Sequence, residues 1–146
     1  MQISISTGAA NAMVGTSGLK GALEAGSMEL RIYAGTMPAD ANDAIGAATL
    51  LVTIKNGASP LTWSTPSGGV VSKPAGETWS GVAAADGVAT FGRFVHATDT
   101  GASSTTEVRV QGDVASVGAF INLDNTAIVN GTVQTVNSAQ LIQPRS

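Results

Sequence analysis

Hydrophobic and polar residues alternate in short runs along most of the chain, and the clearest run is residues 28–34. Alternation with a period of two residues is typical of a β-strand that buries one face and exposes the other. We therefore expect a strand over residues 28–34, with Glu29, Arg31 and Tyr33 on its exposed face.

Similar runs, separated by Gly, Asn, Asp and Ser, predict further strands. They cover residues 48–55, 61–63, 70–73, 77–82, 88–97, 106–111, 119–123, 127–129 and 132–136. Residues 88–97 are apolar on both faces, which predicts a central strand. Gly92 within this strand predicts a bulge or the close approach of another backbone. Asn56-Gly57 and Asn130-Gly131 are typical of tight turns, and we expect the second to join the last hairpin.

Many short strands separated by turn residues predict an all-β fold. We expect residues 27–146 to form one domain, a jelly-roll-like antiparallel β-sandwich. Trp63 and Trp79 each lie in a predicted strand among Thr and Ser. Their size predicts that both fill the core between the sheets.

Residues 1–26 show a different pattern, in which small and apolar residues recur at helical spacing over residues 7–14 and 19–23. Gly26 is predicted to end the second helix. Helices this short are not stable alone, so they must pack on the β domain or on a neighbouring subunit. We expect residues 1–26 to form a helical N-terminal arm that reaches a neighbour.

Composition narrows the possible functions. The chain has 146 residues, enough for one core, and only 12% of them are charged, about half of the usual share of ~25%. A surface covered mainly by Ser, Thr, Asn and Gln favours association with another surface. The net charge of −3, with Lys and Arg scattered singly, argues against nucleic-acid binding. The chain has no cysteine, which excludes disulfides and thiolate metal sites.

The beginning of the chain lacks the basic and apolar regions of a secretory signal. No apolar run approaches the ~18 residues of a membrane span. We expect a product that stays in the cytoplasm until it is assembled, with no membrane partner.

One group of residues has the types found in a hydrolytic triad: His96, Asp99, Ser103 and Ser104. A triad depends on geometry, and a histidine beside a Ser-rich loop is common by chance. The simpler interpretation is a polar tip at the end of a strand, and we expect no enzymatic activity.

Three other motifs have simpler explanations. Asp40, Asn42 and Asp43 offer oxygen ligands for a hard cation, but the loop lacks the glycine and the closing glutamate of an EF-hand, and such residues are also common loop formers. Gly15, Gly18 and Gly21 lack the features of a phosphate-binding loop. Asn130-Gly131-Thr132 fits a glycosylation acceptor, but a hairpin turn explains the same residues.

Glu77, Asp86 and Asp113 could pair as the acid and base of a glycosidase, but sequence does not fix a carboxyl separation. A sugar cleft also normally contains more aromatic residues than the 4% present here. We predict no catalytic, cofactor or metal residues.

Several segments in a fixed order resemble a family of small structural proteins of tailed bacteriophages. These are STGAANAMVG (residues 6–15) leading to Leu19-Lys20, LRIYAGTMPADA (30–41), SKPAGETW (72–79) and DGVATF (86–91). The likeness continues through residues 101–106, 111–114 and 122–128. It therefore covers nearly the whole chain, although none of these motifs is chemical.

The resemblance implies a virion component that is assembled in the host cytoplasm. It is compatible with a capsid decoration or cement protein that binds the major capsid protein and bridges capsomers, as a homotrimer. Two alternatives are a fibre adhesion module that recognises a glycan and a head-to-tail connector component. A small hydrolase built around His96 is a third.

Overall fold

The structure is a computed structural model that describes residues 1–143. It is mostly β, with two short helices, α1 (Thr7–Met13) and α2 (Gly18–Glu24), among the described residues. The strands are β1 (Ile3–Ile5), β2 (Met28–Ala34), β3 (Thr49–Asn56), β4 (Val70–Ser72), β5 (Trp79–Val82), β6 (Gly87–Val88), β7 (Phe91–His96), β8 (Val110–Ala115), β9 (Ile121–Leu123), β10 (Ala127–Ile128) and β11 (Val133–Ile142).

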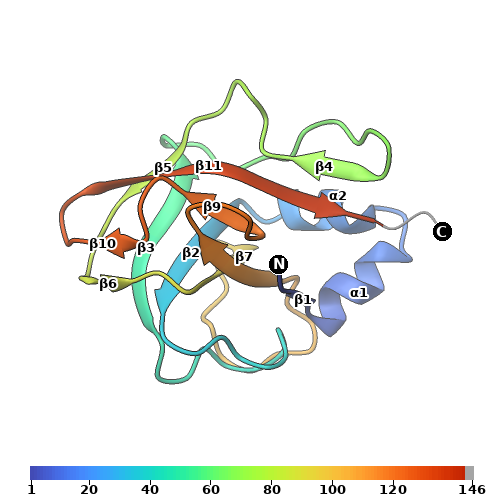
Figure 1. The fold of residues 1–146 in the computed structure, drawn as a ribbon. Coiled ribbons are helices and arrows are strands. Elements are labelled where there is room, and N and C mark those ends of the chain that lie inside the picture. The colour runs from blue at the N-terminus through green and yellow to red at the C-terminus, as the bar shows by residue number, and fades with distance from the viewer. Residues whose placement is uncertain (144–146) are drawn as a thin grey trace.

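Within the described residues, seven strands close into a β-barrel (Figure 1). Neighbours follow the order β8-β7-β2-β3-β5-β11, and β9 closes the ring because it pairs with both β11 and β8. The β8–β9 pairing is parallel and the other pairings in the ring are antiparallel. The all-β prediction is confirmed. The finer prediction of a jelly-roll sandwich is not confirmed, because the pairings follow a closed ring.

The remaining strands lie outside the ring. β1 pairs with β8, β4 pairs with the end of β11, and β6 and β10 form a separate two-stranded ladder. The predicted last hairpin is therefore wrong, since β10 pairs with β6 and not with β11. The turn itself is present: Gly131 has φ 84°, and the Thr132 amide donates to the Val129 carbonyl at 3.1 Å.

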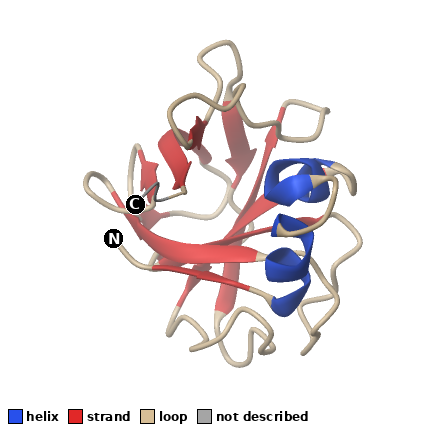
Figure 2. Ribbon diagram, turned by 90° about the vertical axis from the view of Figure 1, so that its right-hand side faces the viewer, coloured by secondary structure: helices blue, strands red, loops and turns tan. Residues whose placement is uncertain are grey.

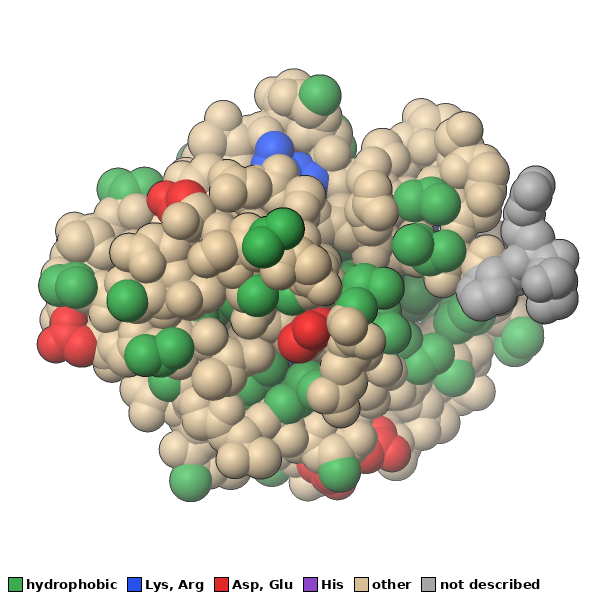
Figure 3. Space-filling view, viewed as in Figure 1, with side chains coloured by type: hydrophobic (Ala, Val, Ile, Leu, Met, Phe, Trp, Pro, Cys, Tyr) green, Lys and Arg blue, Asp and Glu red, His purple; other side chains and the backbone are tan. Residues whose placement is uncertain are grey.

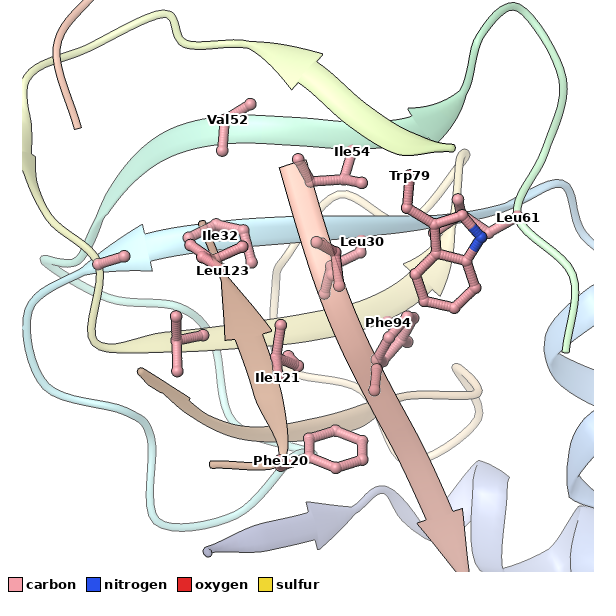
Figure 4. Close-up of a cluster of buried hydrophobic side chains, with 14 of the residues drawn as sticks. Leu30, Ile32, Val52, Ile54, Leu61, Trp79, Phe94, Phe120, Ile121 and Leu123 are labelled. Atoms are coloured by element: carbon pink, nitrogen blue, oxygen red, sulfur yellow. The ribbon is translucent and has the colours of Figure 1, made fainter. Parts of the chain in front are cut away.

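Apolar side chains from all around the ring fill the barrel (Figure 4). Trp79 is 0% and Trp63 is 3% exposed, so the prediction that both tryptophans lie in the core is confirmed. The rings of Trp63 and Phe94 are 4.9 Å apart, and those of Trp79 and Phe94 are 5.9 Å apart. The second pair meets edge to face, which is a favourable arrangement for aromatic rings.

The strand predicted over residues 28–34 is β2, with the same bounds. Its predicted exposed face is nevertheless buried: Glu29 is 6% and Tyr33 is 5% exposed. The reason is long-range, because the loops of residues 35–48 and 97–109 fold over this outer face of the barrel. Alternation along one strand carries no information about such a cover.

The central strand predicted over residues 88–97 is divided into β6 and β7. The strand is interrupted at Ala89 and Thr90. There the Ala89 amide donates to the Thr126 carbonyl and the Thr90 amide donates to the Tyr33 carbonyl, at 2.9 Å each. β7 is central as predicted, between β2 and β8. No register shift occurs at Gly92, where an added Cβ would lie 2.7 Å from the Ile121 side chain. The predicted close approach is therefore made by side chains and not by a backbone.

Two other strand predictions are shifted or wrong. The strand expected over residues 106–111 begins only at Val110, as β8, and residues 61–63 contain no strand. Residues 106–109 instead face the start of α1. An added Cβ at Gly8 would lie 2.4 Å from the Thr106 carbonyl oxygen, so glycine is required for this contact.

The N-terminal segment contains both predicted helices and also β1, which the prediction missed. The helices lie side by side against one side of the barrel (Figure 2), where Leu23 is fully buried in the core cluster. α2 ends at Glu24, before Gly26. An added Cβ at Gly26 would lie 2.2 Å from the His96 ring, so this glycine allows close packing. The predicted role as an arm toward a neighbour stays a prediction.

Candidate functional site

The structure does not join the triad-like residues into a catalytic relay. His96 Nε2 lies 2.6 Å from the Ala22 carbonyl oxygen, so this nitrogen carries the proton and donates. The Asp99 carboxylate accepts two hydrogen bonds from Arg109 and one from the Gly101 amide. Ser104 Oγ accepts from the amides of Thr106 and Glu107. Each side chain therefore has a local structural partner.

The oxygens of the Asp40–Asp43 loop are used within the loop and against α1. Asp40 Oδ1 accepts from the Asn42 amide at 2.8 Å, and Asn42 Oδ1 accepts from the Thr7 amide at 2.8 Å. Over residues 1–143, no group of three or more His, Asp or Glu side chains is placed to hold a metal ion. The loop is thus an Asx turn that positions α1.

The other carboxylates singled out from the sequence lie at separate positions and accept from nearby groups. Glu77 accepts from Trp79 Nε1 at 2.5 Å, Asp86 from the Asn130 amide at 2.7 Å and Asp113 from the Phe120 amide at 3.0 Å. Each stabilises a turn or a strand end. Of the three glycines considered for a phosphate loop, Gly18 begins α2, with φ 64°.

The sequence-based analysis missed a buried ionic layer on the outer face of β2, β7 and β8. Arg31 and Arg93 are directly opposite on paired strands, as are Arg93 and Gln111. Arg93 and Arg109 are each 1% exposed. The available signal for this layer was the run of polar residues at alternate positions of β2, with the isolated Arg93 in β7 and Gln111 in β8.

An ion pair between Asp99 and Arg109 is the strongest contact of this layer. Arg109 Nε donates to Asp99 Oδ2 at 2.6 Å and Nη2 donates to Oδ1 at 2.7 Å, with each side chain 1% exposed. Burial alone would raise the pKa of Asp99, but the hydrogen bonds from Arg109 and Gly101 outweigh it and hold that pKa below its usual value. The same pair raises the pKa of Arg109.

Among residues 1–143, no carboxylate is bonded to Arg93. Its Nε and Nη2 donate to Gln111 Oε1 at 3.0 and 2.6 Å, and its Nη1 donates to the Asp43 carbonyl at 3.2 Å. Burial and the nearby charge of Arg109 lower the pKa of Arg93. These bonds tie the loop of residues 35–48 to β7 and β8.

Four exposed valines lie on the two neighbouring segments 82–88 and 127–133, which belong to β5, β6, β10 and β11 and the turns between them. Val82, Val88, Val129 and Val133 are 63%, 60%, 57% and 60% exposed. Val82 and Val133 are direct cross-strand partners, and Val88 pairs with Ala127. We call these four residues the valine patch. Single exposed apolar residues are ordinary, whereas a cluster is typical of a contact surface.

A second apolar surface is a groove of about 490 Å³. It lies between β1 and the helices on one side and β4 and the end of β11 on the other, and Figure 3 shows hydrophobic side chains gathered in this hollow. Its lining includes Ile3, Ile5, Leu19, Val71, Leu141 and Ile142. In Figure 1, β6 and β10 lie at the opposite end of the molecule from the helices, β1 and β4, which border the groove.

No protein-family model, curated protein or solved structure matches the chain. The resemblance to phage virion proteins therefore rests on the sequence motifs alone. Over residues 1–143, neither helix has the length and apolar character that a membrane crossing requires.

Proposed function

We propose that this protein is a structural component of a tailed-bacteriophage virion. In its most specific form it is a capsid decoration protein that binds the shell and stabilises contacts between capsomers. One observation supports the proposal most: the barrel has two separate exposed apolar surfaces, the valine patch and the groove, toward opposite ends of the molecule. A body with two such ends can bind two neighbours at once and hold them together.

The surface chemistry supports the same role. With 12% charged residues, the molecule offers little long-range repulsion to another protein. Two different contact surfaces also suit a homotrimer, because rings close through contacts between unlike patches. The predicted sequence family contributes the choice of partner, the major capsid protein.

The fibre alternative has less support from the geometry. Every Trp, Tyr and Phe side chain is at most 5% exposed, so none presents a face on which a sugar ring could stack. A connector component remains the nearest competitor. The number of copies per particle distinguishes a decoration protein from a connector component, because a decoration protein covers the shell and a connector forms one ring.

The valine patch provides the test. We expect the double variant Val82→Glu and Val133→Glu to bind decoration-free shells at least tenfold more weakly, because charge would have to be buried at the contact. Val117→Glu is the matched control, since Val117 is 84% exposed and lies outside the patch. Co-sedimentation with shells measures both. Equal binding of the double variant and the control would contradict a role for the patch.

A further inference from the structure

The groove lies where the strand pairing around the barrel is incomplete. β1 and β9 both pair with β8, β1 at residues 110–112 and β9 at residues 114–115. β11 pairs with β9 up to Ala139 and then continues to Ile142 beyond the start of β9. The end of β11 and β1 therefore face each other across the groove without pairing.

Among residues 1–143, the edge of β1 that faces away from β8 has no main-chain partner. The Asp113 amide donates to Gln2 O, and the Ser6 amide donates to Arg109 O, both at 3.0 Å. In an antiparallel ladder, hydrogen-bonded positions alternate. The amides and carbonyls of Ile3 and Ile5 therefore point away from β8.

The end of β11 has the same property on its side of the groove. The Lys73 amide donates to Ala139 O and the Gln143 amide donates to Gly69 O. By the same alternation, the amides and carbonyls of Gln140 and Ile142 point away from β4. The amide of Gln140 faces β9 beside the Ala139–Ile121 pair, so the open groups are those of Ile142. Two strand edges with open hydrogen-bonding groups thus border one apolar groove.

The directions of these edges suit a single inserted strand. β1 and β11 both run antiparallel to β8, since β11 is antiparallel to β9 and β9 is parallel to β8. β1 and β11 are therefore parallel to each other. One extended segment can run antiparallel to both and pair with both.

We propose that this groove binds an extended segment of the capsid-shell protein, which completes the sheet between β1 and β11. This inference rests on the proposed function. The segment has apolar side chains at alternate positions, directed at Leu19, Val71 and Leu141, because only one face of an added strand meets the groove.

A second copy of the chain is a less suitable occupant. Every strand among residues 1–143 already pairs within its own molecule. A strand that pairs with both β1 and β11 needs both of its edges free, so a neighbouring copy would have to break an existing pair to supply one, whereas an extended surface segment of a partner needs no such break.

Amide hydrogen exchange of the complete protein, free and bound to decoration-free shells, tests the assignment. We expect the amides of Ile3, Ile5 and Ile142 to exchange at least tenfold more slowly in the bound state. We also expect Ile3→Pro, which removes an outward amide, to weaken shell binding at least tenfold. Ile3→Val keeps that amide and is the matched control.

The outcomes are distinct. Shell binding without protection of these amides would overturn the groove assignment alone. Absence of shell binding would overturn the proposed function and the groove assignment together. Protection of the same amides in a dimer of the free protein would identify a second copy as the occupant and overturn the assignment to the shell.

Discussion

At the residue scale, the buried Asp99–Arg109 pair braces the loop of residues 97–109 from within, because both residues belong to that loop. Both side chains are buried, and Arg109 also donates to the carbonyls of Ala41 and Ala102. Removing one member of a buried pair leaves the other charge uncompensated, which costs far more than losing an exposed pair.

We therefore expect Arg109→Met to lower the free energy of unfolding by about 3–5 kcal/mol. Lys55→Met is the control, because Lys55 is half exposed and Glu29 keeps Arg31 as a partner. Its expected cost is below about 1 kcal/mol. Urea unfolding measures both, and equal costs would contradict the importance of the buried pair.

Asp99 also predicts a pH dependence. Its folded pKa is lowered, so the unfolded chain binds a proton more readily than the folded protein does. The stabilisation is complete above the unfolded pKa, about 3.9, and is lost as the pH falls through the folded value. Urea unfolding between pH 7 and pH 2 should show a flatter decline for Asp99→Asn than for the unmodified protein. Parallel curves would refute this origin.

The candidate catalytic and metal-binding residues show what residue types alone can predict. His96, Asp99 and Ser104 are close in sequence, yet each has its own local partner. The ionic layer was missed because Arg31 and Arg93 are 62 positions apart in numbering and meet only through strand pairing. Their cover depends on two loops whose path no local pattern fixes.

At the element scale, Ser6 joins β1, α1 and the start of β8. It caps α1 by accepting from the Ala9 amide at 3.1 Å, accepts from the Arg109 amide at 2.9 Å and donates to the Glu107 carbonyl at 2.6 Å. It is fully buried. The N-terminal segment is therefore attached to the barrel by more than apolar contact.

We expect Ser6→Ala to cost about 1–2 kcal/mol, because a helix cap and buried hydrogen bonds are lost together. Ser17→Ala is the matched control, since Ser17 precedes α2 without making a side-chain cap, and it should cost less than about 0.5 kcal/mol. Thermal unfolding compares the two variants. A control as damaging as Ser6→Ala would disprove the special position of Ser6.

Local patterns predicted individual elements better than their pairing. β2 has its predicted bounds because its alternation is strict, and both short helices follow from their spacing. Asn130-Gly131 forms a turn, but the strands around it find partners far away in the sequence. A turn residue fixes the local φ. Strand pairing depends instead on competition among the edges of all the strands, and a short stretch of sequence does not contain that information.

At the scale of the whole molecule, the closed ring determines which strand edges stay exposed. Closure removes most exposed strand edges, which otherwise promote aggregation. The ring leaves the groove between β1 and β11 and the valine patch as its two apolar contact surfaces. Under the proposed function, this arrangement limits unspecific strand pairing and leaves defined surfaces for contact with other subunits.

The composition predicted an adhesive surface, but not where its contacts lie. Val82 and Val133 are far apart in the sequence and become neighbours only because β5 pairs with β11. The groove likewise requires β1, which the sequence pattern did not indicate.

A cryo-electron microscopy reconstruction of the mature phage particle, with protein quantification in the same preparation, tests the proposed function most directly. We expect density for this barrel over the outer surface of the shell, in a copy number comparable with that of the major capsid protein, and with its apolar ends against neighbouring subunits. Absence of the protein from purified particles would contradict a virion role altogether.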